Sequence, residues 1–371
     1  MTGGVFLPKQ ISCNTTKSLN VITTMIRKIS AMLALVFTSS LAHAAEILHF
    51  AGKDGPGKGK HIVLVAGDEE YRSEQSLPML GKILSQKHGY ACSIIFSWSA
   101  DGTYIDPNNQ KGLEGFEALD DADLMIIATR FREPSPEQAA HLTSFLNAGK
   151  PVIGLRTATH AFSGEGDFGG LPYQEFGIKI LGEQWVDHHG GHKTQGGRAL
   201  IEDGQKDNPI LNSVRDIFCY SDVYTVANLT DKDTILLRAE VTESLDPNSK
   251  ALTNKKNNPP MPFAWLHTYT SPDGKKEGQS FCTTTGAAVD FMSEDLRRLI
   301  VNASYSLTGI DVPAKADVAF VDEFKPAFYG FIQEKDYWKT QNLTPASFQL
   351  GKSPILPNPA GSPEGFWLKW Q

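Results

Sequence analysis

The chain has 371 residues, of which 40% are hydrophobic, and this share is enough for a folded core and excludes a disordered or fibrous protein. Its 35 Lys and Arg against 42 Asp and Glu give a net charge of −7, which argues against a protein built to hold nucleic acid. Four cysteines without close spacing exclude a disulfide scaffold and a cysteine-type zinc ribbon.

The N-terminal residues have the pattern of an export signal. A basic pair follows Met25, residues 29–41 are apolar, and small residues at positions 42 and 44 have the spacing of a cleavage site. The apolar stretch is shorter than the roughly 20 residues that a bilayer span needs. We therefore predict translation from Met25 and cleavage after Ala44. The product is an acidic protein exported to the periplasm or beyond, without a membrane span.

Export permits disulfides, but three cysteines remain after this cleavage: Cys92, Cys219 and Cys282. Each lies in an apolar run that is typical of a strand. We predict that they are buried as small hydrophobic side chains.

Strands and helices alternate between residues 61 and 155. The strands are expected at residues 61–67, 91–97, 123–129 and 151–155, and the helices at residues 73–88 and 136–148. The strands are apolar throughout, and the helices carry apolar residues at i, i+3 and i+4. This pattern predicts an α/β fold with a mostly parallel sheet and helices on both faces.

The pattern changes after residue 197. Further strands are predicted at residues 198–201, 234–238, 263–268 and 279–284, and a closing helix at residues 294–308, before Gly309. The turn sequence Ser271-Pro-Asp-Gly favours a hairpin between the last two strands. We predict one α/β domain over residues 45–312, and an extended C-terminal arm over residues 313–371 that packs on it.

Charged loops follow three of the predicted parallel strands. These loops contain Asp68, Glu69, Glu70 and Arg72 after the first strand, Arg130 after the third, and Arg156 and His160 after the fourth. Open α/β sheets bind ligands outside the carboxyl ends of their strands. Each loop alone is compatible with a solvated surface turn, but together they predict a site at this edge.

A second candidate is the glycine-rich segment that holds Asp187, His188, His189 and His192. Three histidines beside an acidic residue are a plausible ligand set for zinc or another divalent ion, which His160 could complete. The alternatives are a surface loop rich in histidine, and histidines that act as acid–base groups. Asp222 and Tyr224 form a third candidate, which either hydrogen-bonds a polyol or belongs to a simple turn.

Several of these segments resemble the ThuA-like (trehalose-utilisation) family. Gly154-Leu-Arg-Thr-Ala-Thr-His160-Ala-Phe162 is similar to its Gly-Leu-His-Ser-Ala-Thr-Asp-x-Phe motif, and Asp222-x-Tyr224 is similar to its Asp-Glu-x-Tyr stretch. Ala264-Trp265 and the segment from Phe281 to Gly286 resemble later motifs, so the resemblance covers roughly residues 60–310. It is closest to an exported branch found in planctomycete-type bacteria.

The resemblance implies the flavodoxin-like fold of class I glutamine amidotransferases, and a role in the catabolism of sugars, particularly 3-keto disaccharides. Some members of the family carry a metal. An amidotransferase needs a nucleophilic cysteine on the sharp turn after a strand, and Arg156 stands at that position here. We therefore expect no glutaminase activity. His160 and Ala287 also depart from the family pattern, which has Asp and His at these positions.

Three functional hypotheses follow. The first is a metal- or histidine-dependent hydrolase, lyase or isomerase of a keto-sugar or glycoside, without a nucleotide cofactor. The acid–base groups expected for it are Glu69, Glu70, Asp187 and His160. The expected substrate-binding groups are Asp68, Arg72, Arg130, Arg156, Asp222 and Tyr224. The expected metal ligands are His188, His189 and His192. The second is a non-catalytic glycan-binding module with Tyr71, Trp185, Tyr224 and Trp265 as stacking surfaces. The third is an interaction protein whose arm docks a partner.

Overall fold

The computed structural model describes residues 1–5, 7, 8, 10 and 46–364. The chain divides into two units, residues 1–44 and residues 45–371. The predicted signal sequence at residues 25–44 lies outside the described residues. Within the described part of the chain, no helix is both long and apolar enough to cross a membrane.

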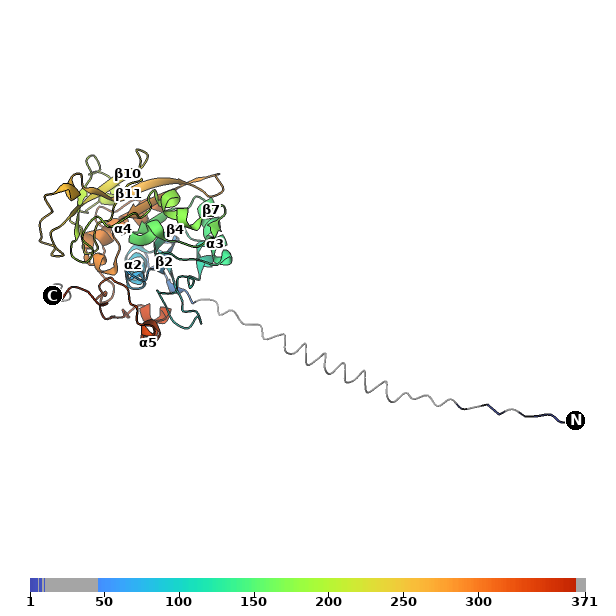
Figure 1. Cartoon of the computed structure of the whole chain (residues 1–371). Coiled ribbons are helices and arrows are strands. Elements are labelled where there is room, and N and C mark those ends of the chain that lie inside the picture. The colour runs from blue at the N-terminus through green and yellow to red at the C-terminus, as the bar shows by residue number, and fades with distance from the viewer. Residues whose placement is uncertain (6, 9, 11–45, 365–371) are drawn as a thin grey trace. The chain divides into compact units, whose positions relative to one another are not determined.

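A ten-stranded sheet runs through the larger unit (Figure 1), in the order β1-β3-β2-β4-β5-β12-β11-β10-β8-β9. Its parallel part consists of β3 (Ala91–Phe96), β2 (His61–Gly67), β4 (Leu124–Thr129), β5 (Val152–Leu155) and β12 (Glu277–Thr283). These five strands have the order 2-1-3-4-5 when numbered along the chain, which is the flavodoxin-like order. The predicted α/β fold is confirmed.

Antiparallel strands extend both sides of this parallel part. They are β1 (Leu48–Phe50) beyond β3, and β11 (Met261–Thr270), β10 (Thr234–Val241), β8 (Gly197–Ile201) and β9 (Phe218–Cys219) beyond β12. The predicted hairpin is the β11–β12 pair. β1 was not predicted, because three residues are too few to show a period, and β9 was expected only as the apolar run around Cys219. β6 (Asp167–Phe168) and β7 (Leu171–Pro172) form a separate two-stranded sheet.

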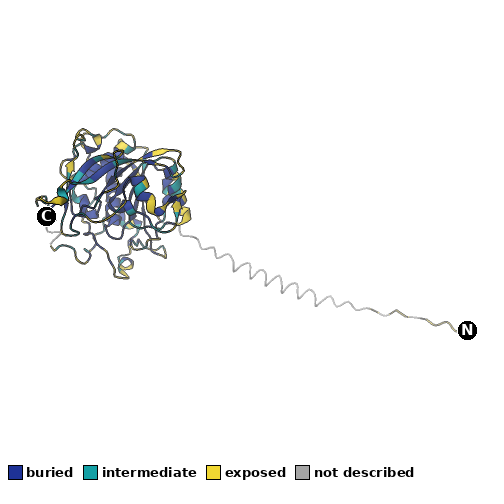
Figure 2. Ribbon diagram, turned by 45° about the horizontal axis from the view of Figure 1, so that its top comes forward, coloured by how far each residue is buried: buried dark blue, intermediate teal, exposed yellow. Residues whose placement is uncertain are grey.

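Helices cover both faces of the sheet, and its strands are dark with burial in Figure 2. Ile62 and Leu64 of β2 pack in one core with α2 (Ser73–His88) and α4 (Glu294–Leu307). Val63 and Val65 point the opposite way and pack in a second core with α3 (Pro136–Asn147). Since successive side chains of a strand alternate between faces, a strand buried on both sides is apolar throughout.

The C-terminal arm packs on this domain. It contains the short helix α5 (Tyr337–Gln341) and a 3-10 turn at Pro345–Phe348, with irregular chain between them. The amide of Ile105 donates to the carbonyl of Leu343 at 2.8 Å, and Lys82 pairs with Asp322 at 2.6 Å. These contacts fix the arm against α2 and the loop after β3.

Candidate functional site

A cavity of about 280 Å³ lies where the order of the parallel strands reverses, between the ends of β2 and β4. Ligands of flavodoxin-like folds bind at this switch point. The ionisable side chains that line the cavity are Glu70, Arg130, Arg156, His160, His188 and His192. Its aromatic lining consists of Tyr71, Phe131, Trp185, Tyr224 and Phe331. The three predicted charged loops and the histidine segment therefore meet in one cavity.

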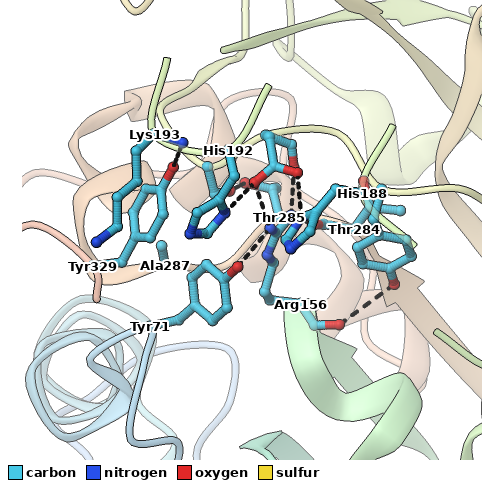
Figure 3. Close-up of polar contacts among 12 residues, drawn as sticks. Tyr71, Arg156, His188, His192, Lys193, Thr284, Thr285, Ala287 and Tyr329 are labelled. Atoms are coloured by element: carbon cyan, nitrogen blue, oxygen red, sulfur yellow. Dashed lines mark hydrogen bonds and ion pairs between the residues drawn. The ribbon is translucent and has the colours of Figure 1, made fainter. Parts of the chain in front are cut away.

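Arg156 begins the sharp turn that follows β5. Its φ of 47° places it in the left-handed region, which a residue with a Cβ rarely adopts. The buried guanidinium donates to the carbonyls of Asp222 and Thr284, and its Nη2 donates to the Tyr71 hydroxyl at 2.9 Å and to Asp222 Oδ1 at 3.1 Å. Arg156 thus anchors the floor of the cavity by joining three separate loops (Figure 3).

Asp222 contacts both cavity histidines, which are labelled in Figure 3. Its Oδ2 lies 2.7 Å from Nδ1 of His188 and its Oδ1 lies 3.1 Å from Nδ1 of His192. Burial alone would raise the pKa of Asp222, but Arg156 and the two imidazole hydrogen bonds outweigh it and hold the pKa well below its usual range. Asp222 is therefore an ionised acceptor. Each imidazole donates from Nδ1 and keeps Nε2 for other partners.

The hydrogen bond to Asp222 also raises the pKa of His188 above its ordinary value, against the opposing effect of burial. His192 is held from a second side, since its Nε2 lies 3.4 Å from Oε1 of Glu70. Burial and the neighbouring Asp68 raise the pKa of Glu70. The site therefore contains two groups, His188 and Glu70, whose pKa values are shifted upward.

Two further polar groups face the cavity. The hydroxyl of Tyr71 accepts from Arg156 and keeps its own hydrogen for donation, because burial raises the pKa of this phenol. His160 lies between the rings of Phe131 and Trp185, with centroids 4.9 Å and 5.3 Å away. Burial and the cations Arg130 and Arg156 lower the pKa of His160 to about 3, so its imidazole is neutral.

Backbone strain is concentrated around this cavity. Within the described residues, six residues other than glycine have a positive φ, and four of them are Arg72, Phe131, Arg156 and Lys193. Each lies in the cavity lining or next to a lining residue in the sequence. Such conformations cost about 1–3 kcal/mol each and are found preferentially at functional sites.

Comparison with known proteins identifies the family of the chain. The family model of ThuA, described as trehalose utilisation, matches residues 63–305. The chain belongs to the ThuA family. No curated protein shows significant sequence similarity to it.

Two solved structures of proteins described as ThuA-like are similar to this ThuA chain. The protein from Bacteroides uniformis is 12% identical with a TM-score of 0.43, over 70% of this chain and 95% of the other. The protein from Parabacteroides merdae is 13% identical with a TM-score of 0.44, over 69% of this chain and 92% of the other.

Some residues that the sequence pointed to lie in the ThuA domain but outside the cavity lining. Nε2 of His189 contacts the carbonyl of Lys256 at 2.6 Å, and the exposed Asp187 accepts from the amide of His188 at 2.7 Å. The three predicted metal histidines therefore do not converge. His188 and His192 meet at Asp222 instead, and one ligand atom from each of these three residues lies within 4.8 Å of the others.

Three charged residues of the loop after β2, Asp68, Glu69 and Arg72, contact the loop itself or neighbouring segments. Asp68 accepts from the amides of Glu70 and Tyr71 at 2.8 Å and 2.9 Å. The carboxylate of Glu69 is held by Arg130 at 2.5 Å and by Arg132. Arg72 is fully buried and donates to the carbonyl of Gly330 at 2.5 Å. These residues give the loop its shape, while Glu70 and Tyr71 face the cavity.

The aromatic residues differ in part from the expectation. Trp265 is fully buried and donates from Nε1 to the carbonyl of Leu181 at 2.8 Å, so its prediction as a stacking surface is wrong. Sequence reasoning missed Phe331, which enters the cavity from the arm, and Tyr329, whose ring lies 5.3 Å from that of His192. The arm has no periodic pattern that could have placed either residue.

Proposed function

We propose that this ThuA-family protein is an exported enzyme that removes a proton next to the carbonyl of a keto-sugar, and so isomerises the sugar or eliminates a glycosidic group from it. The observation that supports this most is the hydrogen bond that the buried Asp222 accepts from Nδ1 of His188. A carboxylate in this position fixes the imidazole tautomer and stabilises the imidazolium that forms when Nε2 takes a proton.

His188 has the properties of a general base. It lines the cavity, and the side chain is 35% exposed, so a substrate can reach it. Histidine is the side chain used most often as a general base, and the hydrogen bond to Asp222 raises the pKa of His188 and so strengthens it as a base. Proton transfer by a positioned histidine accounts for about 10²–10⁴ in rate.

Tyr71 and His160 are suited to hold the carbonyl oxygen. When the C–H proton passes to Nε2 of His188, the electron pair of that bond moves onto the carbonyl oxygen and makes it negative. The Tyr71 hydroxyl, polarised by Arg156, can donate to this oxygen, and so can the neutral imidazole of His160. Fixed donors aimed at a developing negative charge stabilise the transition state.

Glu70 completes the proton balance. In an elimination, the bond from the adjacent carbon to the glycosidic oxygen breaks and the leaving oxygen needs a proton. Glu70 lies beside His192, and its raised pKa favours the protonated acid. In an isomerisation, this proton goes instead to the former carbonyl carbon, while the hydroxyl proton of the carbon that lost its C–H proton passes to the former carbonyl oxygen. His188 and Glu70 thus act as base and acid in one turnover.

The cavity walls suit a sugar. Trp185, Phe131 and Phe331 offer ring faces to the apolar C–H side of a pyranose, while Arg130 and the histidines offer hydrogen bonds to its hydroxyls. This combination of aromatic faces with a few polar groups supports carbohydrate as the substrate class. It also serves the alternative, a glycan-binding module without turnover.

A divalent ion is a second candidate for this site. Two imidazoles and one carboxylate, with ligand atoms within 4.8 Å, fit the usual donor set of zinc, so His188, His192 and Asp222 are the residues that would hold it. A bound ion would polarise a substrate oxygen or lower the pKa of a bound water. Asp222, buried between the histidines, would keep both rings in place in either case.

The proposal is tested with protein of residues 45–371 and 3-keto forms of trehalose, maltose and cellobiose in D2O. Loss of the proton signal next to the ketone, or release of a monosaccharide, reports the reaction by NMR. We expect His188→Ala to lower the rate by about 10²-fold or more and His189→Ala, whose ring faces Lys256, to keep it. Sugar binding with neither exchange nor product would contradict the enzyme and favour the binding module.

A further inference from the structure

The C-terminal arm supplies one wall of the cavity. Phe331 is 44% exposed and belongs to residues 313–364, which lie outside the matched ThuA domain of residues 63–305. Its ring lies 5.0 Å from the guanidinium carbon of Arg130, and that same carbon lies 4.7 Å from the ring of Phe131. The arm and the domain therefore contact the same cation at the mouth of the site.

The backbone beside Phe331 is hydrogen-bonded to the loop after β2. The amide of Gly330 donates to the carbonyl of Glu70 at 2.8 Å, and the carbonyl of Gly330 accepts from the buried Arg72 at 2.5 Å. The ring of Tyr329 stacks on that of Tyr71 with centroids 5.1 Å apart. Phe331 thus has a defined position relative to Glu70 and Tyr71, the groups that the proposed function places against the substrate.

Phe331 also lines a second, larger hollow. This groove has a volume of about 620 Å³, and its lining within the described chain comes entirely from the arm: residues 331–334, Tyr337 and residues 357–360. The two hollows share Phe331, so the groove borders the cavity at this ring. The inner cavity of about 280 Å³ is smaller than the about 300–1,000 Å³ typical of small-molecule sites.

We propose that the groove of the arm binds the second sugar unit of the substrate, so that the enzyme acts on neutral disaccharides or longer glycosides rather than on free monosaccharides. This rests on the proposed carbohydrate function and extends it. The ring of Tyr337 and the two prolines of the groove offer apolar faces to a sugar, and Gln333 and Asn358 offer amides to its hydroxyls.

The charge of the groove selects among saccharides. Glu334 is the one charged side chain among the described residues that line it, and it is acidic. A carboxylate repels uronic acids and sugar phosphates and leaves neutral rings unaffected. Since the inner cavity is the smaller of the two hollows, the groove of the arm is where a second ring would add to binding.

The test blocks the groove without touching the inner cavity. Gln333 is exposed and lines the groove, so Gln333→Trp places a large side chain in it; Lys335 is exposed on the same segment but does not line it, so Lys335→Trp is the matched control. Calorimetry measures binding of trehalose, maltose, cellobiose and their 3-keto forms, each against the corresponding monosaccharide. Thermal unfolding of each variant checks that the fold is intact.

We expect wild type and Lys335→Trp to bind at least one disaccharide about 10-fold or more tightly than its monosaccharide, and Gln333→Trp to lose this preference while keeping the affinity for the monosaccharide. Equal affinities in wild type, or an unchanged preference in Gln333→Trp, would overturn the inference about the groove and leave the proposed function standing. Failure of every saccharide to bind would overturn both. A disaccharide preference without turnover would support the groove and contradict the enzyme.

Discussion

Asp222 accepts a hydrogen bond from Nδ1 of His188 at 2.7 Å, although the two residues are 34 positions apart in the sequence. The same carboxylate contacts Nδ1 of His192 at 3.1 Å and Nη2 of Arg156 at 3.1 Å. One buried negative charge thus joins the strained turn after β5 to the histidine loop. His188 and His192 therefore share one acceptor, whereas His189 contacts the carbonyl of Lys256.

The first prediction concerns metal uptake. Protein of residues 45–371, incubated with zinc and freed of excess ion, is expected to retain about one zinc per chain, held by His188, His192 and Asp222. The variant with both His188→Ala and His192→Ala is expected to retain none, and elemental analysis measures the ratio. His189→Ala is the matched control, because its Nε2 contacts the Lys256 carbonyl. Retention by the double variant equal to that of wild type would refute this ligand set.

The second prediction is that Asp222→Ala destabilises the fold by about 3–5 kcal/mol, because it leaves the buried Arg156 without its carboxylate. Denaturant unfolding measures the change. Asp233→Ala is the control, since the nearly buried Asp233 pairs with His267 and not with an arginine. We expect a smaller loss for it, and an equal loss in the two variants would contradict the role given to Arg156.

The ion pairs of Asp222 also make the stability of the fold depend on pH, in a direction that can be predicted. The pKa of Asp222 is lowered in the folded protein, so its stabilisation is complete above about pH 3.9 and is lost as the pH falls through the lowered value. The pKa of His188 is raised, so its contribution is complete below about pH 6.5 and is lost as the pH rises through the raised value. The difference in unfolding free energy between wild type and His188→Ala should therefore be larger at about pH 6 than at about pH 9; a difference that grows with pH would show the sign to be wrong.

The fourth prediction concerns Gly330. Its φ of 150° lies in the region that favours glycine, and an added Cβ would lie 2.7 Å from Nζ of Lys193 and 3.0 Å from Cγ of Pro359. We expect Gly330→Ala to cost about 1–3 kcal/mol and to weaken saccharide binding, since Phe331 is the next residue. Gly309→Ala is the control: its φ of 73° is also positive, but an added Cβ there meets no described atom within 4 Å, and Gly309 does not line the cavity or the groove. If Gly330→Ala left the sugar affinity unchanged, the arm would not contribute to saccharide binding at the site.

The fifth prediction is that the native protein of residues 45–371 does not react with a thiol reagent. Cys92, Cys219 and Cys282 are all buried, and the structure records each of them as a free thiol within the described residues. Burial raises the pKa of each thiol, so little reactive thiolate forms. Labelling with Ellman's reagent should detect three thiols in denaturant and almost none without it. Rapid labelling of the native protein would mean that a cysteine is accessible.

The elements of the parallel part could be predicted from the sequence because their signals are local. The apolar runs of β2, β3 and β4 and the periodic faces of α2 and α4 appear within each segment, and each predicted range agrees with the structure to within one or two residues. Among the described strands, β1, β6 and β7 lacked such a signal, because their two or three residues take their conformation from a neighbouring strand.

The candidate site was only partly predictable. The charged loops after β2, β4 and β5 were placed at one edge by topology alone, and the cavity lies there. Which side chain of a loop faces the cavity depends on the local backbone. His188 and His189 are adjacent but face different partners, and Arg72 turns away from the cavity to hold Gly330.

The sequence by itself determined the α/β class, the order of elements along the chain, the ThuA resemblance and the arginine at the position of a nucleophile. Each of these depends on residues that are close together in the sequence. The tertiary structure alone decided that Asp222 pairs with His188 and His192, that Trp265 belongs to the core, and that Phe331 closes the cavity. These relationships join segments between 30 and 201 residues apart. Such contacts depend on how the sheet, the loops and the arm come together, and no local pattern of the chain specifies that.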